Sequence, residues 1–600
     1  MKKYSDLVSA AIREIFGEDV SRNLDFDFSR TEEKFGDFAT NAAMIIFSSA
    51  RKLPEFREKL DQLSLKNPRE LAEKIRENLI ETGEFADVEI AGPGFLNLRV
   101  SAKNLARDLN KMSSEGSFAK NSRYENQVVV TEFSDPNPFK VLHIGHLYTS
   151  IVGDAISNLV ANAGGKVHRV NFGGDVGRHV AKNLYAISRK LESEFNEQLN
   201  DNSAAKMSKL VGEDANDRAN WMAARYVEGT NADEDSEDAK AEISRINAEV
   251  YRFHRENDHE SPLAKIYWTC RTWSYEYFDA FYARVGVKFE KYYPESTTAD
   301  LGLAAVRENI GKVYEKSSES DAIIFPGEKY GLHTRVFINS AGLPTYEAKD
   351  VGLSLKKWQD YHFDRSIIIT GNDILEYMKV VIKSISMFAP EPASRTLHLT
   401  HGNVKLAGGV KMSSRKGNFV RAVDVLNLTE KLQGEESGSR NPMIALGAIK
   451  FAFLSSGIGP DLVFEPETSV SLTGNSGPYV QYAAVRVNKI LKDNKFATSR
   501  KPSLATADKY DYSEEKNLLM KLLEYPGVLD DATENLAPHK IANFTFELAK
   551  ELNRYYEKTP VATAEVPKEI REIRLQMLAQ IADIFAQALG ILGIQIPEKM

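Results

Sequence analysis

The sequence predicts an α/β protein built on a parallel sheet, preceded by an α+β segment and followed by an all-helical one. A Val-rich run at 127–133 leads through a proline-punctuated loop into a helical pattern, which is typical of a strand–loop–helix unit. Strand and helix signals then alternate as far as TLHLTHGNV (396–404), and such alternation favours a parallel sheet. From about residue 471 the pattern is helical to the end.

The length of 600 residues predicts three or more domains. We expect boundaries in the polar stretch 110–126 and near 471, giving domains at 1–115, 116–470 and 471–600. The first contains AGPGFLNLRV, a Gly-Pro-Gly turn followed by an alternating strand. An acidic, Asn-rich helical stretch at about 189–260 interrupts the central domain, and we expect it to be an insertion on the surface.

The composition, with 42% hydrophobic and 27% charged residues, is typical of a folded soluble protein. The sequence has no secretory signal pattern and no run of 18 apolar residues, so we expect a cytoplasmic protein without a membrane span. Cys270 is the single cysteine, which excludes an internal disulfide and a multi-cysteine zinc site. The net charge of −8 argues against indiscriminate nucleic-acid binding but allows a selective RNA partner.

The motif His143-Ile-Gly145-His146 lies where the loop after 127–133 enters its helix. Ligands bind at the carboxyl ends of parallel strands, and helix N-termini attract phosphate. The two histidines share one helix face and can donate hydrogen bonds to phosphate oxygens, while Gly145 lets a flat base approach the backbone. Taken alone, the motif could also be a pair of histidines at an ordinary helix start. The sequence has no GxGxxG and no Walker loop.

The segment KMSSRKG (411–417) follows two glycines and precedes NFVRAV, which we expect to be a strand. A glycine-flanked loop that carries cations can close over a triphosphate and neutralise the leaving pyrophosphate. Lys411, Met412, Ser413 and Ser414 are therefore candidate ATP-binding residues. Taken alone, the segment could also be an exposed basic loop without a role.

HIGH followed about 270 residues later by KMSSR resembles the class I aminoacyl-tRNA synthetases, whose signatures are HIGH and KMSKS. The resemblance implies a Rossmann-like catalytic domain that uses ATP, with Mg²⁺, as a substrate. Ser414 stands where KMSKS has its second lysine. The arginyl enzymes often carry this form, and in them a lysine just ahead of HIGH is thought to compensate. Lys140 occupies that place.

Further segments resemble the arginyl-tRNA synthetase family along nearly the whole chain, and least over 189–260. They are TEFSDPNPFKVLHIGH, GGDVG (173–177), GPYVQYAAVR (477–486), the ending LGIQIPEKM, and AGPGFLNLRV in the N-terminal domain. The resemblance implies an arginine–tRNA ligase whose partners are tRNA(Arg), L-arginine and ATP. It also implies an N-terminal domain that touches tRNA, a helical anticodon-binding domain, and a need for tRNA before activation. We expect a monomer.

The arginine side chain is a planar cation with five donors, which carboxylates bind well. Glu132 ends the strand before HIGH, and Tyr346 and Asp350 share one face if they lie on a helix. From the sequence alone that pair could be a surface pair. The resemblance implies that all three contact the guanidinium group, that Asn137 holds the backbone end of arginine, and that Asp373 meets ribose or substrate. Asp373 could instead cap the next helix.

The implied reaction needs no protein nucleophile. The arginine carboxylate attacks the α-phosphate of ATP, and the terminal ribose of tRNA then takes the arginyl group. Catalysis should be positioning and charge stabilisation by Lys140, His143, His146 and Lys411.

Three other classes of protein compete with this interpretation. A small-molecule nucleotidylyltransferase also uses an HxGH site, but it is normally shorter and lacks the C-terminal helices. A synthetase-like RNA-binding protein without catalysis would not need the intact motifs. Among the synthetases, the cysteinyl and many methionyl enzymes need cysteine-rich zinc sites, and a glutamyl pocket should be basic.

Overall fold

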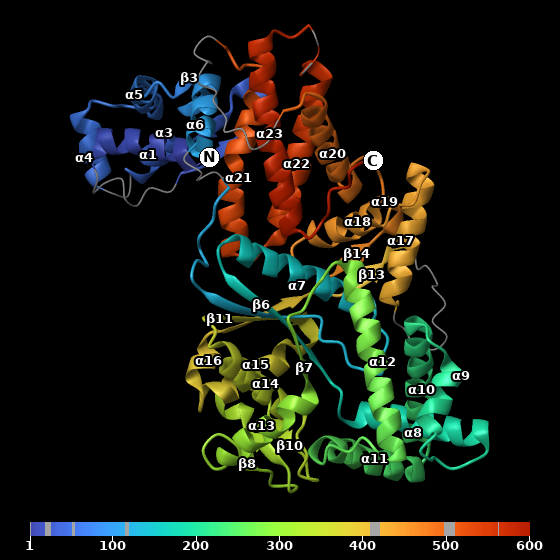
Figure 1. Cartoon of the computed structure of the whole chain (residues 1–600). Helices are drawn as coiled ribbons and strands as arrows, with labels where there is room; N and C mark the ends of the chain where they lie inside the picture. Colours follow the sequence, from blue (N-terminus) through green and yellow to red (C-terminus); the bar gives the residue numbers. More distant parts are fainter. Residues whose placement is uncertain are drawn as a thin grey trace. The chain divides into compact units, whose positions relative to one another are not determined.

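A computed structural model describes residues 2–17, 26–50, 54–114, 119–407, 420–496, 510–561, 563 and 565–600. The chain forms two compact units (Figure 1). The first comprises Met1–Lys120, Arg486–Asp530 and Glu547–Ile584, and the second Asn121–Val485, Asp531–Phe546 and Phe585–Met600. None of the described helices combines the length and apolar composition needed to cross a membrane.

The first unit contains an antiparallel sheet with strand order β1-β2-β4-β3. Its strands are β1 (Phe28–Arg30), β2 (Phe38–Thr40), β3 (Phe85–Ala91) and β4 (Phe95–Val100). The strand predicted after the Gly-Pro-Gly turn is confirmed as β4. Gly94 has a φ of +134°, and a Cβ there would lie 2.9 Å from the Pro68 carbonyl oxygen, so this turn requires glycine.

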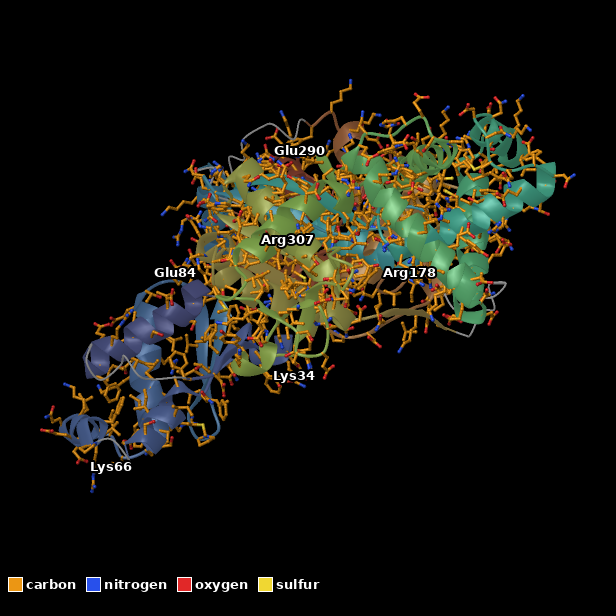
Figure 2. The ribbon with its side chains drawn as sticks, turned by 90° about the horizontal axis from the view of Figure 1, so that it is seen from below. Lys34, Lys66, Glu84, Arg178, Glu290 and Arg307 are labelled. Atoms are coloured by element: carbon orange, nitrogen blue, oxygen red, sulfur yellow. The ribbon has the colours of Figure 1, made fainter. Side chains whose placement is uncertain are left out.

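Several helices belong to the same unit as this sheet, and ion pairs with Glu84, the residue before β3, connect two of them to it. The helices are α1 (Lys2–Phe16), η1 (Glu33–Phe35), α3 (Ala42–Ser49), α4 (Pro54–Gln62), α5 (Pro68–Glu81) and α6 (Ala102–Ser114). Glu84, which is labelled in Figure 2, lies just before β3. It accepts hydrogen bonds from Lys3 of α1 and Arg107 of α6, each at 2.9 Å. The α+β character predicted for the N-terminal segment is confirmed.

The C-terminal part of the chain is helical, as predicted. Its helices are α20 (Gly477–Asp493), α21 (Lys516–Glu534), α22 (Pro538–Lys558) and α23 (Lys568–Ile591). Within the first unit, Arg574 of α23 is buried and its Nε donates to Glu515 Oε1 at 2.9 Å. Lys516 of α21 pairs with Asp37 at 2.7 Å.

The second unit is built on a sheet whose five described strands are all parallel, in the order β12-β11-β5-β6-β7. They are β5 (Val128–Glu132), β6 (Lys166–Gly173), β7 (Lys291–Pro294), β11 (Arg365–Gly371) and β12 (Thr396–His401). The strands predicted within 127–133, 364–373 and 396–404 are confirmed. β5 comes first along the chain and lies between β6 and β11, so the strand order reverses beside it. Ligands bind in the crevice at such a reversal.

The predicted helix after HIGH is confirmed as α7 (Ile144–Asn162), which packs closely on the sheet. A Cβ at Gly153 would lie 2.1 Å from the ring of Phe133, so only glycine allows this approach. The apolar residues Leu147, Ile151 and Val152 are buried on this helix. The close packing fixes the start of α7 at the carboxyl end of β5.

Residues 178–285 form a helical layer with its own core. Its helices are α8 (Arg178–Phe195), α9 (Ser203–Val211), α10 (Ala215–Asp235), α11 (Glu237–Arg255) and α12 (Pro262–Val285). The helical prediction for 189–260 is confirmed, but the expectation of a surface location is wrong for the apolar face. Met207, Met222 and Phe253 are buried in one cluster with Cys270 and Trp273, because each helix is amphipathic.

Some acidic residues of this layer pair with cations on neighbouring helices, as Asp233 of α10 does with Arg178 of α8. Arg178 of α8 donates from Nε to Asp233 at 3.3 Å and from Nη1 to Ser244 at 3.0 Å. Those partners belong to α10 and α11. The arginine therefore connects three helices at the end of α8 nearest the site.

A second core joins further helices to a small antiparallel sheet, β10-β9-β8. These elements are α13 (Glu295–Glu308), β8 (Glu315–Lys316), β9 (Ile323–Phe325), η2 (Gly327–Tyr330), β10 (Arg335–Ile338), α14 (Tyr346–Tyr361), η3 (Asn372–Ile374), α15 (Leu375–Ser386) and α16 (Pro390–Ser394). A Cβ at Gly302 would lie 1.8 Å from the Ala348 carbonyl oxygen. This glycine contact brings α13 against α14, the helix that carries Tyr346 and Asp350.

The segment after KMSSRKG differs from its prediction. The remaining elements are β13 (Val404–Leu406), α17 (Ala422–Ser437), α18 (Pro442–Leu454), β14 (Leu462–Phe464) and α19 (Pro466–Ser469). Of the strand expected at NFVRAV, residues 418–419 lie outside the described residues, and the expectation is wrong for 421–423, because Arg421 forms an isolated bridge and Ala422 already begins α17. Arg421 Nε donates to Asp424 at 2.7 Å. An acidic residue in the first turn favours a helix there.

Candidate active site

The loop that leaves β5 has an unusual backbone. Ser134, Asp135 and Phe139 have φ values of 75°, 45° and 67°, a left-handed region that residues other than glycine rarely adopt. Such strain persists only where the surroundings hold it, and it clusters at functional sites. Asp135 Oδ1 accepts a hydrogen bond from the Phe172 N–H at 2.8 Å, so β6 holds the loop.

Asn137 is held in the same way. Its Oδ1 accepts a hydrogen bond from the Gly174 N–H at 2.8 Å, in the GGDVG turn that follows β6. The side-chain carbonyl is therefore used by the backbone, and Nδ2 is the part of the amide that can donate to a substrate. The predicted site residue lies at the carboxyl edge of the sheet, as its motif suggested.

The two histidines of HIGH hold one another and the first turn of α7. The Gly145 N–H donates to His143 Nδ1 at 3.1 Å, and the His143 N–H donates to His146 Nδ1 at 3.2 Å. A nitrogen that accepts carries no proton, so each neutral ring is protonated at Nε2. A Cβ at Gly145 would lie 2.8 Å from the His143 ring. Gly145 is thus required by the capping histidine itself.

Both rings are neutral at physiological pH. Burial, and secondly the charge of Lys140, lowers the pKa of His143 to about 4. Burial, followed by the neighbouring His143, lowers the pKa of His146 well below its ordinary value. These histidines therefore offer N–H donors rather than positive charges.

Two later segments of the chain return to the start of α7. The Ile144 N–H donates to the Val420 carbonyl at 2.8 Å, and the Ala422 N–H donates to the Leu142 carbonyl at 2.9 Å. At the end of β12, His401 Nε2 lies 2.7 Å from the Thr149 hydroxyl. The predicted residues Lys411, Met412, Ser413 and Ser414 lie outside the described residues.

Asp350 and Tyr346 lie at the start of α14, and their surroundings differ. The Tyr346 ring is 52% exposed, and its hydroxyl lies 3.5 Å from His179 Nδ1. Asp350 is partly buried and accepts a hydrogen bond from the Tyr377 hydroxyl of α15. Burial raises the pKa of Asp350 to about 8, against the lowering effect of the Tyr377 hydrogen bond, and Glu132 raises it further.

Glu132 lines the same cavity as Asp350, but its charge is already balanced by Lys357. It is buried and forms an ion pair with Lys357 of α14, and Lys357 Nζ also donates to Ser366 Oγ at 3.2 Å. Glu132, Asp350 and Lys357 line one small cavity, whose other walls include Leu353 and Met378. The structure thus brings together the two carboxylates that the sequence singled out.

Asp373 lies in η3, directly after β11. It is exposed, and a Cβ at Gly371 would lie 2.5 Å from its Oδ1. Its charge opposes the lowering of the pKa of His143 and of His401, so it lies near the first turns of α7. The N-cap of α15 is Ile374, without a side-chain capping bond. The capping alternative for Asp373 is therefore wrong.

Sequence reasoning missed a buried pair beside these residues. Lys349 Nζ donates to Glu295 Oε2 at 2.6 Å, and both side chains are buried. The ammonium group also lies 5.0 Å from the centre of the Tyr346 ring. Glu295 directly follows β7, and a polar residue at the carboxyl end of a parallel strand was the signal that could have found it.

His179 is a second residue that the sequence did not single out. Its Nε2 donates to the Gly174 carbonyl at 2.7 Å, and burial, followed by the charge of Lys140, lowers its pKa to about 3. The ring is therefore neutral and ties α8 to the GGDVG turn. Asp175 in that turn accepts from Arg271 Nε at 2.9 Å and from the Ser296 hydroxyl at 2.7 Å.

Comparison with known families fits this architecture. Residues 109–464 match the family described as "tRNA synthetases class I (R), catalytic domain". The chain belongs to the arginyl-tRNA synthetase family. Residues 2–100 also match the "Arginyl tRNA synthetase N terminal domain", and residues 480–600 the "DALR anticodon binding domain".

Relatives of the arginyl-tRNA synthetase family are similar to the chain from end to end. A curated protein of Phocaeicola vulgatus named "Arginine--tRNA ligase" is 27% identical, over 100% of this chain and 99% of its own length. One of Flavobacterium psychrophilum with the same name is 28% identical, over 99% and 98%. The arginyl-tRNA synthetase of Thermus thermophilus has a similar fold, with a TM-score of 0.70 and 21% identity over 100% of both chains.

Membership in the arginyl-tRNA synthetase family confirms the predicted fold class and activity. The chain is an aminoacyl-tRNA ligase of class I, and at family level an arginine–tRNA ligase with ATP, arginine and tRNA(Arg) as its partners. A nucleotidylyltransferase and the cysteinyl, methionyl and glutamyl enzymes are excluded by the same matches.

Proposed function

We propose that the chain activates L-arginine at the carboxyl edge of the parallel sheet, with Asp350 as the principal partner of the guanidinium group. The observation that carries the proposal is the raised pKa of Asp350, a carboxyl group that shares a cavity with Glu132. A bound cation would give Asp350 the kind of positive partner that Glu132 already has in Lys357. Tyr346 closes the exposed side, and Asn137 Nδ2 donates to the backbone end of arginine. Glu132 is the second carboxylate of the pocket, held in place by its ion pair with Lys357.

ATP binds at the start of α7 in this proposal. His143 and His146 donate from Nε2 to phosphate oxygens, and the helix N-terminus adds its dipole. Lys140 neutralises charge in place of the lysine that Ser414 replaces. Gly145 keeps the capping histidine in place.

The KMSSR loop is the second part of the proposed ATP site. Lys411, Met412, Ser413 and Ser414 would meet the triphosphate from the segment that ends at Val420. Support comes from Val420 and Ala422, which pair with the residues around HIGH. Mg²⁺ enters with the ATP phosphates as part of the substrate.

The proposed reaction has two transfers. The arginine carboxylate attacks the α-phosphate, the bond to the β-phosphate oxygen breaks, and pyrophosphate leaves. A hydroxyl of the tRNA terminal ribose then attacks the carbonyl carbon of the adenylate, and AMP leaves. Asp373 would hold the ribose or the amino acid beside α7. Positioning and charge stabilisation supply the catalysis.

We further propose that the functional domains span 1–115, 116–470 and 471–600, that the first touches tRNA and that the last binds the anticodon arm. The family matches over 2–100 and 480–600 support this division of labour. We also propose that the enzyme works as a cytoplasmic monomer.

An aminoacylation assay with each of the twenty amino acids, total tRNA and Mg-ATP tests the proposal. Arginine should be attached and the other nineteen should not. Preferential charging of another amino acid would overturn the assignment of the pocket. Size-exclusion chromatography with light scattering, at assay concentration, tests the monomer.

A further inference from the structure

Tyr226 of α10 lies against the lysine that precedes HIGH. Lys140 Nζ is 4.6 Å from the centre of the Tyr226 ring, within the distance of about 6 Å at which a ring face attracts an ammonium group. Tyr226 is half-buried. It belongs to the stretch 189–260, to which the sequence assigned no role.

The backbone beside Lys140 is held on both sides by buried side chains. The Phe139 N–H donates to Ser274 Oγ at 2.9 Å, and the Phe139 carbonyl accepts from Asn183 Nδ2 at 3.2 Å. Phe139 has a φ of 67° and its ring stacks on Tyr267. The residue before Lys140 therefore has one conformation, which sets where the lysine side chain starts.

The same buried amide positions α10. Asn183 Nδ2 also donates to the Met222 carbonyl at 2.9 Å, one helical turn before Tyr226. Further along α10, a Cβ at Gly229 would lie 2.0 Å from the Lys182 carbonyl oxygen, so α10 lies directly on α8. The Asn183 side chain thus connects the backbone next to Lys140 with the backbone one turn before Tyr226.

The Lys140 side chain itself is long and needs a second contact. A four-carbon stem has many rotamers, and the backbone fixes only its first atom. The positive charge is close enough to His143, His146 and His179 to lower the pKa of each. Those rings cannot attract an ammonium group as counter-charges when neutral. The ring face of Tyr226 is the contact that holds Nζ.

We propose that Tyr226 is a positioning residue for Lys140, and that α10 in this way completes the ATP site. The inference rests on the proposed role of Lys140 toward the ATP phosphates. It gives the helical stretch 189–260 a part in the reaction.

The test compares Tyr226→Leu with Tyr226→Phe in the full-length enzyme. Leucine fills similar space without a ring face, whereas phenylalanine keeps the face and loses only the hydroxyl. We expect kcat/KM for ATP to fall about 5- to 30-fold in Tyr226→Leu, and by less than about threefold in Tyr226→Phe. Equal losses in both variants would overturn the proposal, because the ring face would then not be the cause.

A double-mutant cycle with Lys140→Met separates positioning from a structural effect. In the Lys140→Met background, Tyr226→Leu should cause no further loss. A loss of the same size as in the wild-type background would overturn the inference and leave the role of Lys140 intact. If Lys140→Met by itself keeps full kcat/KM for ATP, the proposed role of Lys140 fails, and this inference fails with it.

Tyr185→Leu is the matched control. Tyr185 lies on α8 in the same helical layer, and Arg189 lies 5.4 Å from its ring centre, so the change also removes a tyrosine that faces a cation. It should lower the melting temperature about as much as Tyr226→Leu while kcat/KM for ATP stays at the wild-type value. If Tyr185→Leu lowers kcat/KM for ATP as much as Tyr226→Leu, the effect is general destabilisation and the proposal is wrong.

Discussion

The raised pKa of Asp350 makes the use of arginine depend on pH. Burial and nearby carboxylates raise this pKa to about 8, so about one carboxyl group in ten is ionised at pH 7. Only the ionised form gives the guanidinium group a full counter-charge. When the competent form is a fraction of the total, the apparent affinity is reduced by that fraction.

The expected size follows from this fraction. Below pH 8, kcat/KM for arginine should rise about tenfold per pH unit, which corresponds to about 1.4 kcal/mol. Above the pKa of about 8 it should level off. kcat/KM reports groups of the free enzyme and free substrate, and this makes it the quantity to measure in aminoacylation assays with saturating ATP and tRNA. ATP should show no such rise, because its proposed partners are elsewhere.

Two variants sharpen the measurement. Asp350→Asn should remove the pH dependence of kcat/KM for arginine. It should also lower the plateau of kcat/KM by an amount equivalent to about 2–5 kcal/mol, because the guanidinium group loses its partner. Tyr377→Phe removes a hydrogen bond that favours the carboxylate, so the midpoint should move to higher pH while the slope remains. A kcat/KM for arginine that is constant between pH 6.5 and 8.5 in the wild type would refute the reasoning.

Four further predictions concern ATP and tRNA. His143→Ala and His146→Ala should each slow adenylation by raising its activation free energy by about 2.7–4 kcal/mol, without changing tRNA affinity. Wild-type rates in either variant would contradict the phosphate-donor role. Because the pKa of His143 is about 4 and that of His146 is also lowered, these rings should cause no loss of rate between pH 7 and 6. Lys140→Ala should reduce turnover sharply and Ser414→Ala only mildly; the reverse ranking would show that Lys140 does not compensate for the missing lysine. Finally, arginine-dependent ATP–pyrophosphate exchange should be nearly undetectable until cognate tRNA is added, because tRNA binding is coupled to the arginine pocket. Robust exchange in RNA-free conditions would contradict that coupling.

Much of the fold could be predicted because it follows from periodicity. β5 could be predicted from a Val-rich run and α7 from the helical pattern after the proline-punctuated loop, and β11 and β12 from apolar runs that end in polar turns. The strand expected at NFVRAV is wrong over its last residues, where α17 begins at Ala422. Asp424, three residues beyond Arg421, decides for the helix through an ion pair with it.

The pairing of side chains within the site could not be predicted in the same way. Glu132 and Asp350 were found because motifs carry them, but nothing local shows that Lys357 neutralises Glu132. That pair joins residues 225 positions apart, and it forms only when α14 packs on the sheet. The role of Tyr226 could not be predicted from the sequence for the same reason, since its partner Lys140 lies on another element.

Charge pairing among these residues supports the proposal that Asp350 binds a cationic substrate. Glu295 has Lys349 and Glu132 has Lys357 as buried partners, whereas Asp350 is held by the Tyr377 hydroxyl. Burial raises the pKa of Asp350 to about 8, and the Tyr377 hydroxyl offsets this rise only in part. A guanidinium group supplies the missing charge, and a neutral isostere cannot. Discrimination against a neutral isostere should therefore increase as pH rises and Asp350 ionises, because the charged carboxylate strengthens the binding of arginine but not that of the isostere.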